Sequence, residues 1–397
     1  MERIGIYGGS FNPPHIGHIA AAKYARDALG LSRLLVIPAC VAPHKDMPAD
    51  SPTPRDRMHM LEIALEGAEN IQVSDIELCR GDRSYTYETV LSLRKMYPDA
   101  EFVLMMGTDM FLSFDRWKNP DIITKNAALA VFYRGDREEK EQIREKKASM
   151  ENAGITVYLV ENPVTQISST DLRRMLVFRC AEPFLNPGVG DYIREHQLYG
   201  TGKNYQGLSL EELEETVVSL LNPNRVNHVL GACKTAAELA VIHGADVVDA
   251  QRAALLHDVT KALPGQLQLT LCREYGINLD DFSAANPKTL HALTGSLVAQ
   301  RIFGENPAVV AAIASHTTGK ADMNTLEKII YVADYMEPNR DFPGVEQLRE
   351  LAYRDLDGAM ILGLEMTLSM LREQGKQVSP GSREALKSLK KSEKREG

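Results

Sequence analysis

The sequence lacks the features of a membrane or secreted protein. Its longest apolar runs, such as residues 102–106, fall far short of the roughly 20 residues that a membrane-spanning helix needs. Its five cysteines are an odd number, lie far apart and form no Cys-x-x-Cys pair, which argues against a disulfide framework or a zinc knuckle. No basic and then apolar leader precedes the first apolar segment. We therefore expect a cytoplasmic protein with reduced thiols and no membrane partner.

The sequence also has no excess of positive charge and none of the commonest nucleotide-binding fingerprints. Its formal net charge of −9 argues against a general nucleic-acid binder and favours small-molecule partners. Neither a P-loop nor a Gly-x-Gly-x-x-Gly string occurs. At 397 residues, with 44% hydrophobic and 25% charged residues, the chain is long enough for two ordinary globular domains.

The most distinctive stretch that is present runs from Ile4 to His18 and reads Ile-Gly-Ile-Tyr-Gly-Gly-Ser-Phe-Asn-Pro-Pro-His-Ile-Gly-His. It begins as a β-branched strand, breaks at Gly8-Gly9 and ends at the head of an alanine-rich helix. Glycine amides can approach phosphate oxygens closely, and a helix N-terminus favours negative charge. His15 and His18, three residues apart at that terminus, can both donate hydrogen bonds to one phosphate. This junction suits a nucleotide triphosphate.

Strand and helix patterns alternate through the first half of the chain. Apolar strands are predicted at residues 34–37, 71–78, 102–106, 129–133 and 155–160, with helices near residues 55–66 and 86–96. Repeated βα units predict a doubly wound parallel sheet, with ligands at the carboxyl ends of its strands. Further along, Ser168-Ser169-Thr170 caps a helix, and Arg173 in its first turns can add a planar charged fork to a phosphate site.

Together these motifs resemble the nucleotidyltransferase superfamily with the His-x-Gly-His signature, and the Gly-Gly-Ser-Phe-Asn-Pro-Pro-His string resembles bacterial nicotinate mononucleotide adenylyltransferases. The resemblance implies adenylyl transfer, in which the 5′-phosphate of nicotinate mononucleotide attacks the α-phosphorus of ATP and expels pyrophosphate, with Mg²⁺ on the phosphates. It implies four residues that neutralise charge in catalysis: His15, His18, Lys45 and Arg173. It implies substrate or ATP contacts from Gly8, Gly9, Ser10, Phe11, Thr86, Gly107, Asp109, Trp117, Ser168, Ser169 and Thr170.

Within these contacts, the resemblance places Thr86 at the pyridine carboxylate, Asp109 at the nucleotide and Trp117 on the pyridine ring. An aromatic face stacks well on a flat heterocycle. The rival hypothesis is a nucleotidyltransferase that acts on a different substrate, either pantetheine phosphate or nicotinamide mononucleotide. The Ser-Phe-Asn-Pro-Pro and Ile-Ser-Ser-Thr strings argue against pantetheine phosphate, whereas nicotinamide mononucleotide stays open.

After residue 199 strand-like segments stop. A glycine-bearing connector spans residues 200–207, and Ser209-x-x-Glu212 reads as a capping box that opens a helix. From there the pattern is helical. We therefore predict an α/β domain over residues 1–203, an all-α bundle over residues 204–378 and a charged C-terminal tail over residues 379–397.

The helical half contains an ordered set of widely spaced imidazoles and carboxylates. Residues of these types suit iron, manganese or other divalent ions. In this order they resemble the metal-dependent HD phosphohydrolase superfamily, and the text around them resembles the YqeK-type HD proteins. The resemblance implies a divalent or di-iron centre held by His228, His257, Asp258, His291, His316 and Asp334.

The YqeK-type resemblance also implies symmetrical hydrolysis of diadenosine tetraphosphate, or a related nucleotide, to ADP. Asp258 and Lys261 would be catalytic, and Lys261 and Arg340 would neutralise phosphates. The alternative from another class is a metal-bound nucleotide sensor that regulates the first half without turnover. The expected partners are thus ATP, nicotinate mononucleotide and a dinucleoside polyphosphate, with a homo-oligomer allowed.

Overall fold

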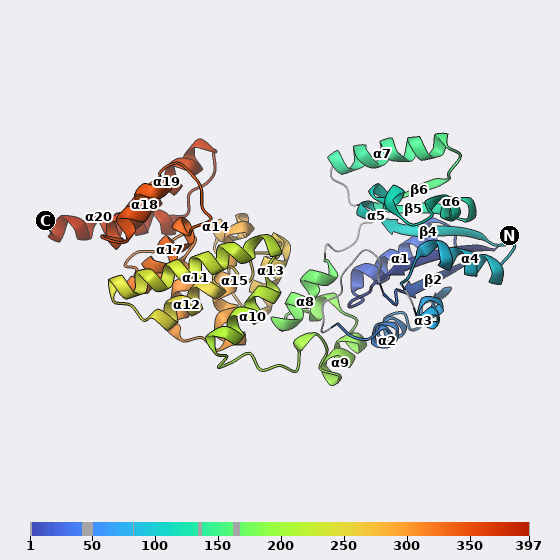
Figure 1. Ribbon diagram of the computed structural model, residues 1–397, viewed down its shortest axis with the longest axis horizontal. Coiled ribbons are helices and arrows are strands. Elements are labelled where there is room, and N and C mark those ends of the chain that lie inside the picture. Colours follow the sequence, from blue (N-terminus) through green and yellow to red (C-terminus); the bar gives the residue numbers. More distant parts are fainter. Residues whose placement is uncertain (1, 42–50, 82, 134–136, 162–166, 397) are drawn as a thin grey trace. The chain divides into compact units, whose positions relative to one another are not determined.

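The computed structural model describes residues 2–41, 51–81, 83–133, 137–161 and 167–396. It divides into two compact units, Met1–Lys203 and Asn204–Gly397 (Figure 1). Lys45, which the sequence analysis assigns to the triphosphate, lies outside the described residues. Every helix among the described residues is too short or too polar to cross a lipid bilayer.

The first unit is built on a six-stranded sheet in the order β3-β2-β1-β4-β5-β6, and every pair of neighbouring strands is parallel. The strand order reverses between β1 and β4, which is where doubly wound sheets bind ligands. The predicted doubly wound fold is confirmed. The strands are β1 (Arg3–Gly9), β2 (Arg33–Pro38), β3 (Ile71–Val73), β4 (Glu101–Gly107), β5 (Ala128–Tyr133) and β6 (Val157–Glu161).

Alternate residues of each central strand enter two different cores. In β4, Phe102 and Leu104 belong to one cluster, while Val103 and Met105 belong to the other. Because successive side chains of a strand point to opposite faces, both faces of the sheet are buried. The covering helices of this unit are α1 (Ile16–Ala28), α2 (Pro54–Ala64), α3 (Ile76–Arg80), α4 (Thr86–Met96), α5 (Thr108–Leu112), α6 (Pro120–Asn126), α7 (Arg137–Asn152), α8 (Ser169–Val177) and α9 (Pro187–Glu195).

Two segments of the first unit differ from the sequence-based expectation. The strand predicted over residues 71–78 ends at Val73, because a polar Ser74-Asp75 turn follows and Ile76 packs as the start of a short helix, α3. Helix α7 was not predicted. Its sequence is mostly charged, and among its described side chains Ile143 and Met150 are buried.

The described regular elements of the second unit are all helical. Ser209 Oγ accepts from the Glu212 N–H at 3.2 Å, and Glu212 accepts from the Ser209 N–H at 2.8 Å, which confirms the predicted capping box. Helix α11 packs against both α12 and α17. The helices are α10 (Leu210–Leu220), α11 (Pro223–His243), α12 (Val247–Leu256), α13 (Gly265–Glu274), α14 (Asp281–Ala285), α15 (Leu290–Val298), α16 (Pro307–Ser315), α17 (Thr325–Met336), α18 (Val345–Ala352), α19 (Leu356–Glu373) and α20 (Pro380–Glu396).

The C-terminal segment, which was expected to be a charged tail, forms a packed helix. Helix α20 packs against α19, and its Ala385 and Leu389 are buried. Ser382 Oγ also donates to the Thr318 carbonyl at 2.7 Å. Although most residues of α20 are polar or charged, its few apolar residues lie on one narrow face, and this face packs against α19.

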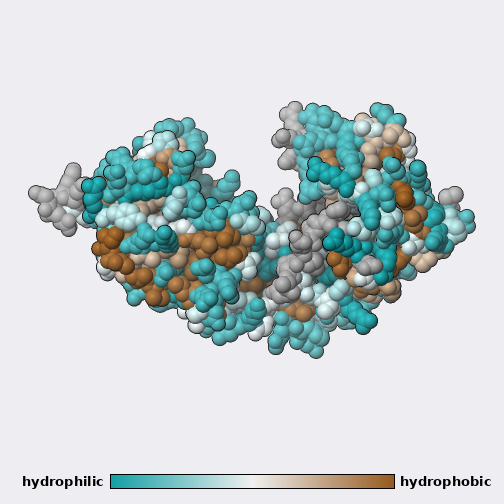
Figure 2. Space-filling model, in the orientation of Figure 1, coloured by the Kyte–Doolittle hydropathy of each residue, from teal (hydrophilic) through white to brown (hydrophobic). Residues whose placement is uncertain are grey.

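One face of the second unit shows apolar residues at its surface over α11 and α12 (Figure 2). Val241 and Ile242 at the end of α11 are 70% and 50% exposed, and Val248 in α12 is 54% exposed. Exposed apolar clusters often mark protein contacts. The homo-oligomer stays a prediction.

Candidate nucleotide site and candidate metal centre

The loop from Gly8 to His15 crosses the carboxyl end of β1 at the sheet's switch point. Tyr7 pairs with Met105 of β4, so β1 and β4 end side by side, at Gly9 and Gly107. Phe11 has φ +45° and is 1% exposed, and a Cβ on Gly9 would come within 3.0 Å of its ring. The Phe11 side chain therefore supports the loop from below, and any contact it makes with a nucleotide would come from its backbone.

The two histidines of the signature stand together at the start of α1. Their rings stack with centroids 3.6 Å apart, and the His15 N–H donates to His18 Nδ1 at 3.3 Å. Phe11 also packs edge-on against His18, at 5.1 Å between ring centroids. With Nδ1 accepting, the neutral His18 ring carries its proton on Nε2, which is a donor of the kind that a phosphate oxygen needs.

The Ser-Ser-Thr segment and Arg173 contact the same loop. Arg173 donates to the Asn12 carbonyl at 2.8 Å and to Thr170 Oγ1 at 3.1 Å, and Ser169 Oγ donates to the Pro13 carbonyl at 3.2 Å. Ser168 Oγ caps α8 by accepting from the Asp171 N–H at 3.0 Å. The structure thus brings the two sequence motifs together. The hydroxyls of Ser168 and Ser169 already donate, to Asp171 Oδ2 and to the Pro13 carbonyl. Thr170 Oγ1 accepts from Arg173, so its own proton can still be donated to a phosphate oxygen.

Asn12 is the centre of this arrangement, and the sequence analysis gave it no role. Tyr199, in the last turn of the first unit, donates to Asn12 Oδ1 at 2.8 Å, and Asn12 Nδ2 donates to Ser51 Oγ at 3.1 Å. Burial raises the pKa of Tyr199, so its hydroxyl keeps the proton that it donates. The loop is therefore fixed by residues from distant parts of the chain.

The segments expected to bind the pyridine ring also meet. Thr86 opens α4, and Trp117 is half-buried with its ring 5.2 Å from that of Phe114. Lys118 Nζ lies 4.0 Å from the centre of the Tyr85 ring, so the residue after Trp117 stands over the residue before Thr86. Two further assigned residues sit at the end of β4: Gly107 is the N-cap of α5, and Asp109 is exposed in its first turn.

Arg57 in α2 joins two loops beneath the site, and no sequence motif indicated it. Its side chain donates to the carbonyls of Ser10 at 2.6 Å and Ala39 at 2.7 Å, and to that of Cys40 at 3.2 Å. It is 1% exposed, and burial lowers its pKa. The guanidinium therefore ties the loop after β1 to the loop after β2.

Replacing Arg57 with lysine should lower the free energy of unfolding of the first unit by about 2–3 kcal/mol, because one ammonium cannot reach carbonyls in both loops. Trp117 is the chain's single tryptophan and lies in this unit, so urea unfolding followed by its fluorescence measures the effect. Arg194→Lys is the control, since Arg194 is 54% exposed and pairs with Asp191 at the surface. Equal unfolding midpoints for the two variants would contradict the assignment.

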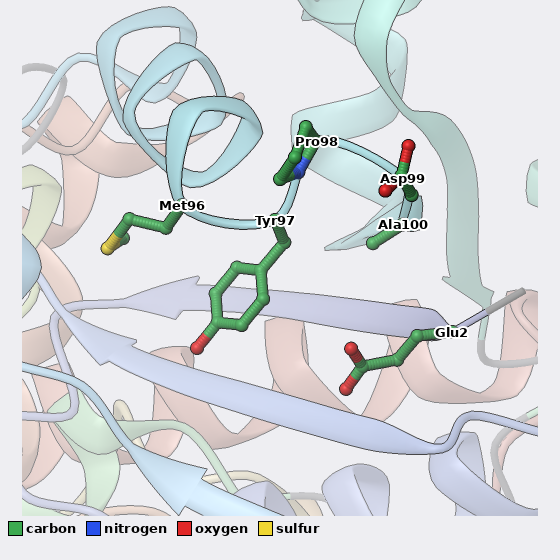
Figure 3. Close-up of a pocket in the computed structure, with 6 residues that line it drawn as sticks. All are labelled: Glu2, Met96, Tyr97, Pro98, Asp99 and Ala100. Carbon is green, nitrogen blue, oxygen red and sulfur yellow. The ribbon is translucent and has the colours of Figure 1, made fainter.

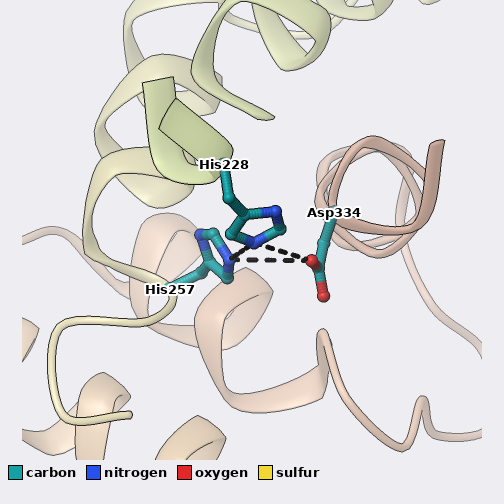
Figure 4. Close-up of side chains that lie close together, drawn as sticks. All are labelled: His228, His257 and Asp334. Carbon is teal, nitrogen blue, oxygen red and sulfur yellow. Dashed lines mark hydrogen bonds and ion pairs between the residues drawn. The ribbon is translucent and has the colours of Figure 1, made fainter. Parts of the chain in front are cut away.

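The six predicted metal ligands of the second unit come together from five helical segments. His228 lies in α11, His257 and Asp258 directly follow α12, His291 lies in α15, His316 directly follows α16 and Asp334 lies in α17. His228 Nε2 lies 3.1 Å from Asp334 Oδ1 and 3.3 Å from His257 Nε2 (Figure 4). His257, Asp258 and His316 form a second group of potential ligands. His291 is outside both groups, although its Nε2 is 3.5 Å from Asp258 Oδ1.

Each imidazole is oriented through its other nitrogen. Nδ1 of His257 donates to the Ala254 carbonyl at 2.6 Å, and Nδ1 of His316 donates to that of Ile313 at 2.7 Å. His291 Nδ1 is likewise 2.9 Å from the Lys288 carbonyl. Carbonyl acceptors place the proton on Nδ1, so the Nε2 lone pairs face the centre, as metal-binding histidines require.

Glu337 orients the fourth imidazole, and the sequence analysis gave this residue no role. It is 1% exposed, and its Oε1 lies 3.1 Å from His228 Nδ1. Its Oε2 accepts from the Asn339 N–H at 2.7 Å. Glu337 thus orients the His228 ring, as carboxylates do for histidines that bind a metal.

The chemistry of this cluster fits a metal ion. Burial lowers the pKa of His257 and of His291 well below the usual value and also lowers that of His316, so these rings stay neutral. Asp258 is 1% exposed, and its Oδ1 is buried without a hydrogen-bond partner among the described residues. A buried carboxylate oxygen facing imidazole lone pairs is costly unless a cation completes it.

Three cations border the cluster. Lys261 Nζ lies 2.8 Å from His291 Nε2, and Arg340 donates to Asp334 Oδ1 at 2.6 Å. Arg225 of α11 pairs with Asp258, a contact that no motif predicted. Burial lowers the pKa of Lys261 to about 8. The cluster thus combines residues of the types that can bind a metal with cations of the types that can bind phosphate.

The first unit also has an open pocket away from these sites. It is lined by Glu2, Met96, Tyr97, Pro98, Asp99 and Ala100 (Figure 3). Glu2 and Ala100 directly precede β1 and β4, so this pocket lies at the amino ends of the strands, opposite the edge that carries the signature loop.

Two family models match the chain: a cytidylyltransferase-like domain over residues 6–175 and an HD domain over residues 225–339. The fold and the two sites thus define a nucleotidyltransferase-type α/β domain followed by an HD domain. Probable nicotinate-nucleotide adenylyltransferases from Oceanobacillus iheyensis and Neisseria gonorrhoeae are 34% and 33% identical, over 51% and 50% of this chain and 100% and 99% of theirs. Through its first half, the chain belongs to the family of these nicotinate-nucleotide adenylyltransferases.

One solved structure is also similar to part of the chain. The crystal structure of a predicted HD superfamily hydrolase involved in NAD metabolism, from Clostridium acetobutylicum, is 35% identical. The match covers 47% of this chain and 98% of that one, with a TM-score of 0.46. The predicted adenylyltransferase resemblance and the predicted HD domain are confirmed by the family matches, and the tetraphosphate hydrolase stays a prediction.

Proposed function

We propose that the first unit transfers AMP from ATP to nicotinate mononucleotide, giving nicotinate adenine dinucleotide and pyrophosphate. The observation that carries this proposal is the meeting of two motifs at the switch point of the sheet, where Arg173 binds the loop that ends in His15 and His18. The curated relatives bear the name of this activity.

The transfer is mainly a matter of positioning and charge neutralisation. In this proposal the amides of Gly8 and Gly9 and the His18 ring hold the triphosphate. Arg173, which donates to the Asn12 carbonyl, brings positive charge to the loop. Mg²⁺ bound to the phosphates would supply further neutralisation. Lys45 remains a predicted phosphate ligand.

The acid form of the pyridine substrate should react faster than the amide form. Thr86 lies at the N-terminus of α4, which favours a carboxylate over a neutral amide, so we expect kcat/KM for nicotinate mononucleotide to be about 10- to 100-fold higher, the equivalent of one hydrogen bond to a charged group. Pyrophosphate release from ATP with each mononucleotide measures the ratio. A ratio near one or below would favour the nicotinamide substrate, and no release with either would refute the transferase.

We propose that the second unit hydrolyses diadenosine tetraphosphate symmetrically to ADP. The observation that carries this proposal is the convergence of imidazole and carboxylate ligands beside Lys261 and Arg340. A divalent metal, for which we propose iron, would polarise phosphate oxygens and activate water. Lys261, with its pKa lowered to about 8, can hold positive charge beside a phosphate or pass a proton to a departing oxygen.

The experiment is incubation of the metal-loaded, full-length protein with diadenosine tetraphosphate. ADP as the main product supports the hydrolase. Tight binding of metal and nucleotide without any product supports the regulatory sensor instead.

A further inference from the structure

Arg225 stands out among the cations at the metal centre. It lies in the first turn of α11, three residues before His228, and its side chain is 29% exposed. Its Nη2 donates to Asp258 Oδ2, while its Nε is buried without a hydrogen-bond partner among the described residues. A buried N–H without an acceptor is costly, which suggests a second partner for this side chain.

Arg225 bonds to an oxygen that also belongs to the ligand set. Asp258 Oδ2 lies 3.5 Å from His257 Nε2 and 3.6 Å from His228 Nε2. Asp258 Oδ1 faces His291 and His316, whereas a metal ion held between His228 and His257 would lie on the Oδ2 side. On that side the metal ion would compete with the guanidinium for Oδ2. If a metal ion bound Asp258 Oδ2, the Arg225 guanidinium would need another anion as its partner.

The charges around the centre indicate which kind of anion could replace Asp258 as the partner of Arg225. Three carboxylates, those of Asp258, Asp334 and Glu337, face three cations. Counted without the imidazoles, these charges cancel, so a divalent ion would leave the centre with an excess of two positive charges. The three cations are Arg225, Lys261 and Arg340, and they are spread around one cluster, so they suit several consecutive phosphates better than a single one.

We propose that Arg225 exchanges partners, neutralising Asp258 in the metal-free protein and binding the oligophosphate chain of a nucleotide once the ligands hold a metal. This inference rests on the proposed phosphohydrolase function of the second unit. It makes Arg225 a specificity-determining residue for substrates with two or more linked phosphates.

The exchange predicts opposite effects of Arg225→Gln on two affinities. Co²⁺ should bind more tightly, by several-fold, because no guanidinium has to be displaced from Asp258. ADP should bind the cobalt-loaded centre about 10-fold more weakly, the cost of one charge-assisted hydrogen bond. The preference for ADP over AMP should shrink with it. A residue that only maintains the fold would weaken both affinities when it is replaced.

The visible absorption of Co²⁺ held in the second unit gives both readouts on the full-length protein, without interference from nucleotide bound to the first unit. Arg225→Lys should restore most of the ADP affinity, because it keeps the charge. Arg354→Gln is the matched control, since Arg354 forms a surface pair with Glu350 and is 75% exposed.

Loss of both affinities in Arg225→Gln, or no change in either, would overturn the exchange while the wild-type protein still binds ADP and releases product. If ADP leaves the cobalt spectrum of the wild-type protein unchanged and no substrate is hydrolysed, the proposed phosphohydrolase function itself fails, and the exchange fails with it.

Discussion

Replacing His257 with alanine should lower the rate of ADP release from diadenosine tetraphosphate by more than about 100-fold. Removing a residue that only orients a metal ligand costs up to about 100-fold, and His257 is itself a predicted ligand. His257 belongs to both groups of potential ligands, and its Nε2 lies 3.5 Å from Asp258 Oδ2 and 3.8 Å from Asp334 Oδ1. No other single substitution touches both groups through an imidazole. Metal content and ADP release, measured on the same preparation, report the effect.

His243→Ala is the matched control for this variant. His243 is also a histidine of the second unit, but its Nε2 bonds to the Ala352 carbonyl at 2.7 Å, at the far end of α11 from His228. It should leave both metal content and ADP release intact. Adenylyl transfer by the first unit should be unchanged in both variants, because its site contains none of these residues. An active, metal-loaded His257→Ala protein would contradict the assignment of the hydrolase activity to this cluster.

The sequence predicts the sheet well because buried parallel strands are continuous apolar runs. The strands at residues 102–106 and 129–133 extend by at most a residue at either end in the structure. The errors fall where apolar content is misleading. Ile76 and Leu78 flank Glu77 in a strand-like alternation, but they form a helix after a polar turn. Helices α7 and α20 bury few apolar residues among many charges.

The residues of the candidate sites also differ in how far they can be predicted from the sequence. Residues that carry the chemistry lie in short motifs, such as His15 to His18, and so can be recognised locally. Residues that hold them in place depend on contacts far apart in the chain: Arg57 reaches Ser10 across 47 residues, and Tyr199 reaches Asn12 across 187. Nothing in the local sequence around Arg57 or Tyr199 distinguishes them from other arginines and tyrosines. Only the fold makes their roles visible.

Replacing His18 with alanine should lower kcat for adenylyl transfer about 10²- to 10³-fold, the usual cost of one lost donor to charge that develops in a transition state. The His18 ring is held by three contacts with two residues: Nδ1 accepts from the His15 N–H, and the ring packs on Phe11 and on the His15 ring. This support gives the Nε2–H a fixed direction. Pyrophosphate release at saturating ATP and nicotinate mononucleotide measures the loss.

Two further variants separate the donor from the packing. His59→Ala is the control, because His59 is 53% exposed on α2 and its Nδ1 lies 3.3 Å from Glu62 Oε2 at the surface, so kcat should not change. His18→Gln keeps a side-chain N–H near the position of Nε2 and should recover part of the lost rate. If His18→Gln were as slow as His18→Ala while both proteins unfolded at the wild-type temperature, the hydrogen-bonding role would fail, and a charged imidazolium would be the better account of His18.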